Sequence, residues 1–287
     1  MEINKYPDDT SYVNDTKLGE QIFRINTYED LFHLKQFVDA FHNEWSNKIT
    51  RIRPNIIIPN LIDAQADRRF KKGESFGLKL VLEFLSNLEA NFKIFHPHNS
   101  EVVEMGMELL GNSVEIIDNS EFIKEVLLRL YTDYSKKDLL QTDHELILLS
   151  TDGGSYKWIN KLADKIDWKG EVYGASKSRN YINGQSKLTQ YIDRQDFQGK
   201  DVLILDDISI RGGTFIGLAK MLRERNCGKL YLAVSHITIP ILTEEFVNSF
   251  DKIFTTDSKG FNYKVIGSGH DKIGYTPENL EIINFFN

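Results

Sequence analysis

A polar run with the sequence DDISIRGGT follows a uniformly apolar stretch and precedes a helical pattern. Gly212 and Gly213 let the backbone turn its N–H groups inward, and Thr214 adds a hydroxyl at a helix N-terminus, where the helix dipole favours anions. Asp206 and Asp207 directly follow the apolar stretch and suit the hydroxyls of a ribose or the waters of a magnesium ion. An acidic strand end before a glycine-assisted turn would look similar, but the full order predicts a phosphate-binding site.

Buried parallel strands and covering helices must position this site. Short apolar runs bounded by turn residues alternate with longer stretches of helical period, which is typical of βαβ units. The apolar runs that predict strands are NIIIP (55–59), FKIF (92–95), VEII (114–117), ELILLS (145–150), VLIL (202–205), LYLAVS (230–235) and KIFTT (252–256). Most are too uniformly apolar to face water on either side, so the sequence predicts an α/β fold with mainly parallel sheets.

The predicted helices carry apolar faces that would cover these strands. The stretch after Ser75 and the stretch 214–225 both repeat apolar residues at helical spacing, and residues 100–111 have a similar pattern. The apolar positions are Leu78, Val81, Leu82, Leu85 and Leu88 in the first stretch, and Phe215, Leu218, Ala219 and Leu222 in the second.

A charged segment, residues 131–145, separates two halves with the same alternation of strands and helices. We therefore place the domain boundary near residue 142, with one domain over 1–142 and a second over 143–287. The halves show no short-period repeat, although they are consistent with two diverged copies of one architecture.

Composition limits the classes of function. The 287 residues carry a net charge of -7, which argues against a nucleic-acid surface or an anionic-membrane surface spread over the whole molecule. A single cysteine, Cys227, excludes an internal disulfide and a multi-cysteine zinc site. No apolar run approaches the roughly 18 residues that a membrane span requires, and the N-terminus is polar. We expect a cytoplasmic protein.

Several segments resemble those of a known enzyme family. DDISIRGGT is similar to the DDxxDTGGT signature of type I phosphoribosyltransferases and ribose-phosphate diphosphokinases. Three segments resemble the diphosphokinases specifically and in order: IPNLIDAQADRRF (58–70) the ATP segment, HPHN (96–99) the metal motif, and STDGG (150–154) the SPDxGG motif. SKSR (176–179) then falls on the family's KRR motif.

The resemblance implies a fold and a reaction. It implies two tandem phosphoribosyltransferase-like domains with the active site between them. The enzymes of this family move the β,γ-diphosphate of ATP to the anomeric hydroxyl of ribose 5-phosphate and release AMP. The resemblance therefore implies ATP as co-substrate, Mg²⁺ as cofactor and self-association into dimers or hexamers.

In the first half, the resemblance assigns ATP and metal contacts. Gln65, Asp67, Arg68 and His98 fall on ATP-binding positions, and His96 and His98 fall on the metal motif. An ordinary solvated charged run and a paired-histidine turn are the alternatives for these two segments. The family's arginine and glutamine before the aspartate are replaced here, which removes a positive charge. His96 stands where the family has aspartate, which favours metals such as Mn²⁺ or zinc.

In the second half, the resemblance assigns catalysis and sugar-phosphate binding. Lys177 and Arg179 would contact the transferring phosphates, in a segment whose glycine, serine and asparagine content favours a loop that closes over ATP. A solvated basic loop is the alternative. Asp152 would help to hold the sugar and its magnesium, although a turn aspartate before glycines has the same sequence. The sugar-phosphate residues by resemblance are Asp206, Asp207, Ile210, Arg211, Gly212, Gly213 and Thr214.

The phosphate loop departs from the family at one informative position. The family's DTGGT appears here as Ile210 to Thr214, with Arg211 in the cradle. The guanidinium offers a bidentate fork to additional phosphate oxygens, so we hypothesise a ribose 5-phosphate that carries a substituent, such as ADP-ribose. The chain resembles a divergent phage relative that makes ADP-ribose pyrophosphate for NAD salvage. Free ribose 5-phosphate remains the other acceptor.

Two further functions stay open at this point. A phosphoribosyltransferase would share the phosphate loop but would exchange the diphosphate of phosphoribosyl pyrophosphate for a base. The ATP-type segment in the first half argues against it. A non-catalytic regulatory relative would bind sugar phosphates without turnover, and the presence of both Lys177 and Arg179 argues against that alternative.

Overall fold

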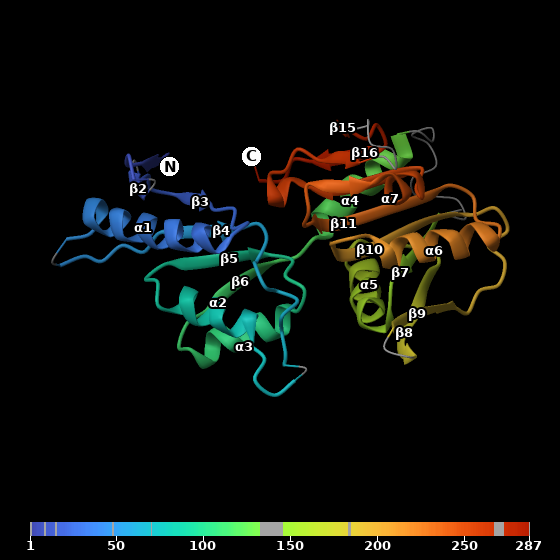
Figure 1. Cartoon of the computed structure of the whole chain (residues 1–287), viewed down its shortest axis with the longest axis horizontal. Coiled ribbons are helices and arrows are strands. Elements are labelled where there is room, and N and C mark those ends of the chain that lie inside the picture. Colours follow the sequence, from blue (N-terminus) through green and yellow to red (C-terminus); the bar gives the residue numbers. More distant parts are fainter. Residues whose placement is uncertain are drawn as a thin grey trace. The chain divides into compact units, whose positions relative to one another are not determined.

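The chain divides into two compact units in the computed structural model, which describes residues 2–8, 10–14, 16–47, 49–69, 71–132, 146–182, 185–266 and 273–286. Within the strands around 183–184, the side chains of residues 178–189 lie outside this description. Unit 1 comprises Met1–Asp118 and Phe286, and unit 2 comprises Asn119–Phe285 and Asn287 (Figure 1).

Unit 1 is built on a four-stranded parallel sheet in the order β3-β4-β5-β6. Its strands are β3 (Glu20–Ile22), β4 (Asn55–Ile58), β5 (Asn91–Phe95) and β6 (Val114–Ile117), beside the antiparallel pair β1 (Glu2–Lys5) and β2 (Ser11–Asn14). Its helices are α1 (Tyr28–Trp45), α2 (Gly77–Ser86) and α3 (Ser100–Leu109). This confirms the predicted strands at 55–59, 92–95 and 114–117.

The sheet of unit 1 buries its apolar face beneath the helices. Ile56 and Ile58 of β4 and Phe92 and Ile94 of β5 are at most 3% exposed and share one core with the apolar faces of the helices. All five leucine and valine positions predicted after Ser75 belong to that core, although the last of them follows the end of α2. The period-3.6 pattern therefore located both the helix and its buried face.

Unit 2 is built on a seven-stranded sheet in the order β16-β13-β11-β10-β7-β8-β9, with the smaller sheet β12-β14-β15 beside it. The large sheet contains β7 (Leu146–Ser150), β8 (Val172–Ile182), β9 (Gln185–Ile192), β10 (Asp201–Ser209), β11 (Leu230–Ile237), β13 (Lys252–Thr256) and β16 (Leu280–Ile283). The small sheet contains β12 (Ile241–Thr243), β14 (Lys264–Ile266) and β15 (Ile273–Tyr275). The helices are α4 (Ser120–Thr132), α5 (Gly153–Lys165), α6 (Gly213–Glu224), α7 (Glu244–Asn248) and the 3₁₀ turn η1 (Asp257–Lys259).

The large sheet reverses its direction of growth between β7 and β10. The chain passes from β7 through α5 to β8 on one side, and from β10 through α6 to β11 on the other. Helices α4 and α5 share a core with one face of the sheet, while α6 and α7 share a core with the opposite face. Because ligands bind at the carboxyl ends of strands where an open α/β sheet reverses, the edge between β7 and β10 is the expected site.

Helix α4 packs in unit 2, whereas the sequence-based boundary near residue 142 placed it in the first domain. Its buried residues Phe122, Ile123 and Val126 belong to the same core as Leu148 of β7 and Leu205 of β10. Residue 142 itself falls in 133–145, outside the described residues. The contacts divide the units at Asp118 because burial of the α4 face, and not local charge, decides where the helix belongs.

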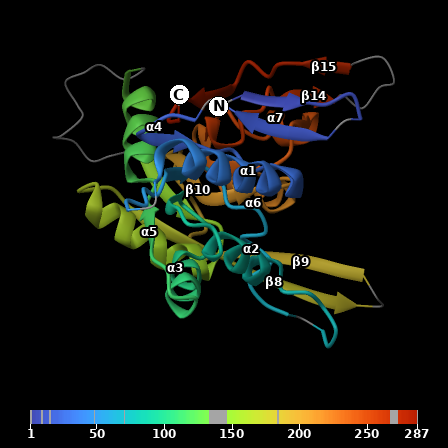
Figure 2. The same ribbon diagram turned by 90° about the vertical axis from the view of Figure 1, so that its left-hand side faces the viewer.

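The segment around Lys177 is a β-hairpin and not the loop that the sequence predicted. Strands β8 and β9 pair antiparallel, with Lys177 opposite Gln190. Figure 2 shows the two strands running together as a two-stranded extension. The sequence between them, Asn183-Gly184, is the dipeptide that most favours a tight hairpin turn, so the signal was present but outweighed by the flexible composition.

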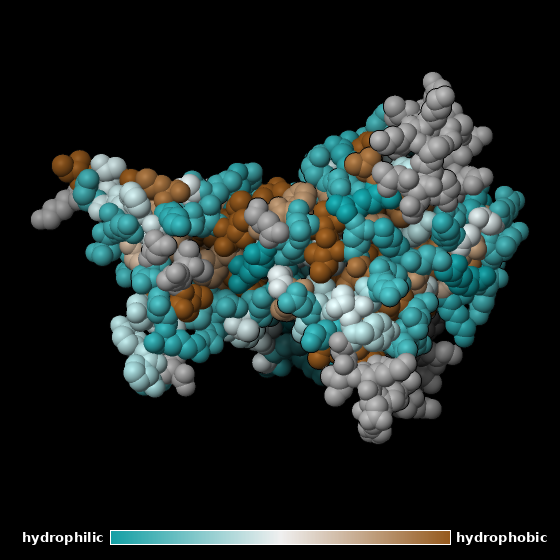
Figure 3. All heavy atoms as spheres, turned by 90° about the horizontal axis from the view of Figure 1, so that it is seen from above, coloured by the Kyte–Doolittle hydropathy of each residue, from teal (hydrophilic) through white to brown (hydrophobic). Residues whose placement is uncertain are grey.

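The surface in view is mostly hydrophilic, with hydrophobic side chains gathered in a few patches (Figure 3). No helix in the described ranges combines the length and the apolar character that crossing a membrane requires.

A charged network joins three segments of unit 2 around Glu171, which precedes β8. Its carboxylate accepts hydrogen bonds from Lys200, Arg194 and the Tyr173 hydroxyl, the last at 2.8 Å. The Arg194 guanidinium also lies 5.2 Å from the ring centres of Tyr173 and Phe197. The hydrogen bond from Lys200, assisted by Tyr173 and Arg194, lowers the pKa of Glu171 to about 2.

We expect Glu171→Gln to lower the free energy of unfolding by about 1 kcal/mol at pH 7, since a carboxylate that is 34% exposed is partly screened by water. The folded pKa of about 2 lies below the ordinary 4.5. The ionised form therefore stabilises the fold in full above pH 4.5, and the gap between variant and parent should close as the pH falls toward 2. Denaturant titrations at several pH values measure this gap. A gap that stays constant down to pH 2 would contradict the assignment.

Candidate functional site

The carboxyl ends of β7 and β10 are joined by a hydrogen bond at the reversal point of the sheet. The Thr151 hydroxyl, which follows β7, donates to Asp206 Oδ2 of β10 at 2.6 Å. Asp206 is among the site residues predicted from the sequence and Thr151 is not, although a polar residue directly after a buried strand was a usable signal. This bond fixes one carboxylate at the edge where a ligand is expected.

Asp206 and Asp207 form an acidic pair whose ionisation is disfavoured. Burial, followed by the charge of Asp207, raises the pKa of Asp206 well above its ordinary value, and the hydrogen bond from Thr151 offsets only part of this. The Asp207 N–H also donates to Asp206 Oδ1 at 3.0 Å. A bound cation or the hydroxyl hydrogens of a sugar would relieve the repulsion between the two carboxylates.

The turn between β10 and α6 requires glycine at position 212. Gly212 is the N-cap of α6 with φ 74°, in the left-handed region that favours glycine. A Cβ at this position would lie 2.3 Å from Cδ2 of the Phe246 ring. Gly213, the first residue of α6, has no neighbouring atom within 4 Å of a Cβ position, so the space beside it is open. The turn at the predicted phosphate cradle is therefore tight at Gly212 and open beside Gly213, and phosphate binding there stays a prediction.

The other predicted cradle residues lie at the open side of this turn. Ile210 is 47% exposed, Arg211 is exposed and Thr214 is partly buried at the first turn of α6. Among the described residues, none accepts a hydrogen bond or forms an ion pair with the Arg211 side chain. The first N–H groups of a helix lack partners within the helix, so this end of α6 offers donors to an anion beside a free guanidinium.

Asp152 caps α5 and binds Lys177 of β8. Its Oδ1 accepts the backbone N–H groups of Gly154 and Ser155, each at 3.0 Å, and its Oδ2 lies 2.5 Å from Lys177 Nζ. Burial opposes its ionisation, but the hydrogen bonds from Lys177 and Ser155 outweigh burial and lower the pKa of Asp152. The structure thus brings together two predicted site residues. The side chain of Arg179 lies outside the described residues.

The segment of unit 1 that is predicted to bind ATP contains a compact polar group. Arg68 donates to Asp67 at 2.8 Å and 3.2 Å, and the Asn99 amide lies 3.5 Å from Asp67 Oδ2. The hydrogen bond from Arg68 lowers the pKa of Asp67, and Asn99 and the charge of His98 contribute in the same direction. Gln65 is exposed, and no contact of its side chain ties it to this group among the described residues.

The predicted metal residues are distributed over both units. His96 is 6% exposed and adopts φ 37°, while His98 is exposed. Both belong to unit 1, whereas Asp152 belongs to unit 2. No cluster of three or more histidine, cysteine or acidic side chains suited to a metal occurs in the part of the chain that the structure describes. The grouping of these three residues around one metal stays a prediction.

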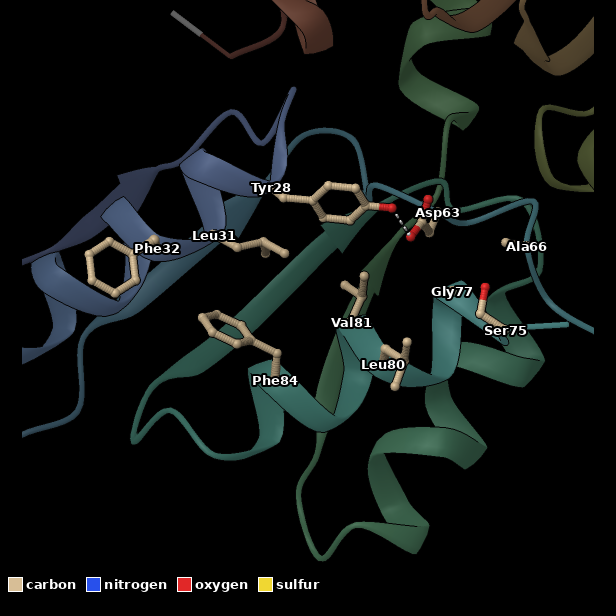
Figure 4. A pocket seen from close by; sticks show the side chains of 10 residues that line it. All are labelled: Tyr28, Leu31, Phe32, Asp63, Ala66, Ser75, Gly77, Leu80, Val81 and Phe84. Carbon is tan, nitrogen blue, oxygen red and sulfur yellow. Dashed lines mark hydrogen bonds between the residues drawn. The ribbon is translucent and has the colours of Figure 1, made fainter. Parts of the chain in front are cut away.

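A groove of about 530 Å³ lies between α1 and α2 of unit 1 (Figure 4). The Tyr28 hydroxyl donates to Asp63 Oδ2 at 2.8 Å at one end, where Asp63 adopts φ 59°. The remaining lining residues are Leu31, Phe32, Ala66, Ser75, Gly77, Leu80, Val81 and Phe84. Asp63 and Ala66 belong to residues 58–70, so the segment predicted to bind ATP lines part of the groove.

Comparisons with known proteins connect this geometry to a family. Residues 117–272, just over half of the chain, match the phosphoribosyl transferase domain family. A ribose-phosphate pyrophosphokinase of Pyrococcus furiosus is 24% identical over an alignment of 289 residues, and this alignment covers 99% of this chain and 92% of that protein. Another from Sulfurisphaera tokodaii is 28% identical over 217 residues, covering 74% of this chain and 66% of that protein.

A solved structure has the same fold. The phosphoribosylpyrophosphate synthetase from Mycobacterium smegmatis matches with a TM-score of 0.68 and 15% identity, covering 99% of this chain and 85% of that one. At this identity the likeness shows the fold, and it confirms the predicted α/β class with phosphoribosyltransferase-type parallel sheets.

We expect Gly212→Ala to lower the free energy of unfolding by about 2–4 kcal/mol, since it combines a left-handed backbone with overpacking against Phe246. Gly213→Ala is the matched control, because its Cβ meets open space. Thermal unfolding of both variants measures the difference. Equal stability of the two variants would show that the turn tolerates a side chain at 212.

Proposed function

We propose that this chain, which belongs to the phosphoribosyl transferase domain family and is a ribose-phosphate diphosphokinase-like enzyme, moves the β,γ-diphosphate of ATP to the anomeric C1 hydroxyl of a ribose 5-phosphate group. AMP is the second product. The observation that carries the proposal is the Thr151–Asp206 hydrogen bond, because it holds an acidic strand end beside the phosphate turn at the reversal point of the sheet.

The turn at the start of α6 would bind the 5-phosphate of the acceptor. Backbone N–H groups from Arg211 to Thr214 and the Thr214 hydroxyl supply donors, and the helix dipole favours the negative charge. Asp206 and Asp207 would then accept hydrogen bonds from ribose hydroxyls. These bonds would offset the burial and the charge of Asp207, which together raise the pKa of Asp206. The acceptor would be held by its two ends, leaving its C1 hydroxyl free to react.

The transfer forms one bond and breaks one. The C1 oxygen attacks the β-phosphorus of ATP, the bond from the β-phosphorus to the bridging oxygen breaks, and AMP leaves with that oxygen while the hydroxyl proton is lost to solvent. Charge that grows on the transferring group needs a cation, and we assign this role to Lys177 and, by resemblance, Arg179. Lys177 would exchange Asp152 for phosphate oxygens as ATP binds.

Magnesium fits the donor set of this site. Carboxylate oxygens are the ligands that Mg²⁺ prefers, and it usually takes one or two of them together with substrate phosphates. Asp152, Asp206 and Asp207 would hold the ion in unit 2, and His96 and His98 are the candidates in unit 1. A bound Mg²⁺ would supply Lewis-acid stabilisation of phosphate oxygens.

We assign ATP binding to Gln65, Asp67, Arg68 and His98 of unit 1. Asp67 is held ionised by Arg68 and Asn99, so the group combines a fixed carboxylate, for ribose or metal waters, with a cation for phosphate. The replacement of the family's arginine by Gln65 leaves Arg68, which pairs with Asp67, as the cation that we assign to phosphate, while Arg69 donates to the Glu74 carbonyl.

The acceptor that we propose is ADP-ribose, with free ribose 5-phosphate as the simpler candidate. Arg211 is exposed beside the phosphate turn and makes no hydrogen bond or ion pair with any described residue. A guanidinium in that position can grip a second phosphate group, which ADP-ribose carries and ribose 5-phosphate lacks. The product would be ADP-ribose pyrophosphate, which suits NAD salvage.

An AMP-release assay tests the reaction and the acceptor together. Purified protein with ATP and Mg²⁺ is incubated with ribose 5-phosphate, ADP-ribose or a nucleoside monophosphate, and AMP is quantified. We expect AMP release that depends on an acceptor with a free C1 hydroxyl, so the nucleoside monophosphate should be inactive. Turnover of ribose 5-phosphate alone would contradict the ADP-ribose proposal. Release of a base from a nucleotide plus diphosphate, without AMP formation, would identify a phosphoribosyltransferase instead.

Replacing the lysine of β8 tests the assignment of the cation. We expect Lys177→Ala to reduce kcat by about 100-fold or more, because one preorganised charge partner of a transition state is worth roughly that factor. The melting temperature should change little. Lys161→Ala, an exposed lysine on α5, is the control and should retain full activity. Unchanged turnover in Lys177→Ala would remove this residue from the reaction.

Replacing the arginine of the cradle tests the acceptor. We expect Arg211→Ala to lower kcat/KM for ADP-ribose by about 10-fold or more, since a charge-assisted hydrogen bond is worth about 1.5–3 kcal/mol. The loss for ribose 5-phosphate should be smaller. Arg211→Lys keeps the charge without the fork and should recover only part of the activity with ADP-ribose. Equal losses of kcat/KM for the two acceptors would show that Arg211 does not bind the additional phosphate.

A further inference from the structure

Gln190 of β9 connects the hairpin to the helix that carries the phosphate turn. Its Nε2 donates to the Thr214 carbonyl at 2.9 Å. Its side-chain oxygen lies where a Cβ on Gly217 of α6 would come within 2.2 Å. The amide therefore packs against α6 at Thr214 and Gly217, and a side chain at 217 would displace it from this position.

The register of the hairpin pairs Gln190 with Lys177. Gln190 is directly opposite Lys177 in the antiparallel pairing of β8 and β9. Directly opposed residues of an antiparallel pair project from the same face, with Cβ atoms about 4.5–5.5 Å apart. Lys177 itself contacts Asp152 at the start of α5. One cross-strand pair thus ties the hairpin to the first turns of two helices.

The hydrogen bond from Gln190 to Thr214 lies at the base of the β8–β9 hairpin. Beyond Lys177 and Gln190, the hairpin runs on to residues 182 and 185 as two strands, and β9 is the edge of the seven-stranded sheet. Two strands alone are marginally stable in water, so their position depends on contacts at the base. Gln190 supplies such a contact on the side of α6.

We propose that Gln190 is a positioning residue, which holds the hairpin against α6 and so sets the place of Lys177 relative to the phosphate turn. This inference rests on the proposed function, in which Lys177 neutralises the transferring phosphates. The amide acts through the Thr214 carbonyl and the Gly217 backbone and does not itself touch the reacting atoms.

The kinetic test uses two changes that break the same contact from opposite sides. Gln190→Glu keeps the shape of the side chain but cannot donate to the Thr214 carbonyl, and Gly217→Ala pushes the amide away. We expect each to lower kcat about 10-fold in the AMP-release assay while the KM for the acceptor changes less than threefold. Gln195→Ala, an exposed glutamine after β9, is the control and should match the parent. Loss in KM alone, with kcat unchanged, would contradict positioning of Lys177.

A double-mutant cycle separates positioning from general damage. Gln190→Ala removes the atoms that a Cβ at 217 would strike, so adding Gly217→Ala to it should cost nothing further in kcat. Because alanine favours helix over glycine, the double variant should also melt at or above the temperature of Gln190→Ala. Losses that simply multiply in the double variant would overturn the proposal, because they would show two independent effects.

Amide hydrogen exchange tests the contact without any activity. We expect exchange in β9 to quicken about 10-fold or more in Gln190→Ala, while β10 and β11 keep the protection of the parent. If the parent protein transfers no diphosphate but this change in exchange is seen, the proposed function is wrong, while the role of Gln190 in holding the hairpin against α6 is supported. If the parent is active and β9 exchanges at the same rate in both proteins, Gln190 does not hold the hairpin against α6 and the inference is wrong.

Discussion

The bend between β10 and α6 depends on the absence of a side chain at Gly212. The residue adopts a left-handed conformation, and the ring of Phe246 fills the place that a Cβ would take. Because of this bend, α6 begins at Gly213 and is separated by only three residues, 210–212, from the end of β10 at Ser209. Its first N–H groups, which lack partners within the helix, follow the strand that carries Asp206 and Asp207. A longer turn would move the first N–H groups of α6 farther from the carboxylates, and the sugar-phosphate site that we propose would not form.

The reversal of the sheet between β7 and β10 leaves the carboxyl ends of these two strands open. Since α5 and α6 leave neighbouring strands toward opposite faces, the ends of β7 and β10 are left uncovered by either helix. Thr151 holds Asp206 across that edge, while Asp152 caps α5 and binds Lys177. Carboxylates, a cation and helix N-termini thereby gather from separate strands. In unit 1, Asp67 and Arg68 form a comparable pair on the segment that resembles an ATP site.

The sequence predicted those features that depend on local patterns. Uniform apolar runs located seven strands, β4, β5, β6, β7, β10, β11 and β13, whereas strands without such runs, such as β8 and β9, were not predicted. The apolar face of α6 was identified residue by residue, because burial on one helical face leaves a regular period. The glycine turn was visible because only glycine suits its backbone. Three features depend on tertiary contacts and were not predicted: the unit to which α4 belongs, the hydrogen bond from Thr151, and the hydrogen bond from Gln190 to α6. The β8–β9 hairpin was misjudged because the glycine, serine and asparagine content of the segment favoured a loop over the Asn-Gly turn signal.

The central claim is that the diphosphate of ATP leaves as one piece for a sugar bound at the turn of unit 2. Following ATP labelled separately at its α-, β- and γ-phosphorus by ³¹P NMR or mass spectrometry tests it most directly. If the diphosphate moves as one piece, the β and γ labels will appear together in the sugar product, while the α label remains in AMP in equal amount. Transfer of the γ label alone, with ADP as the other product, would contradict it.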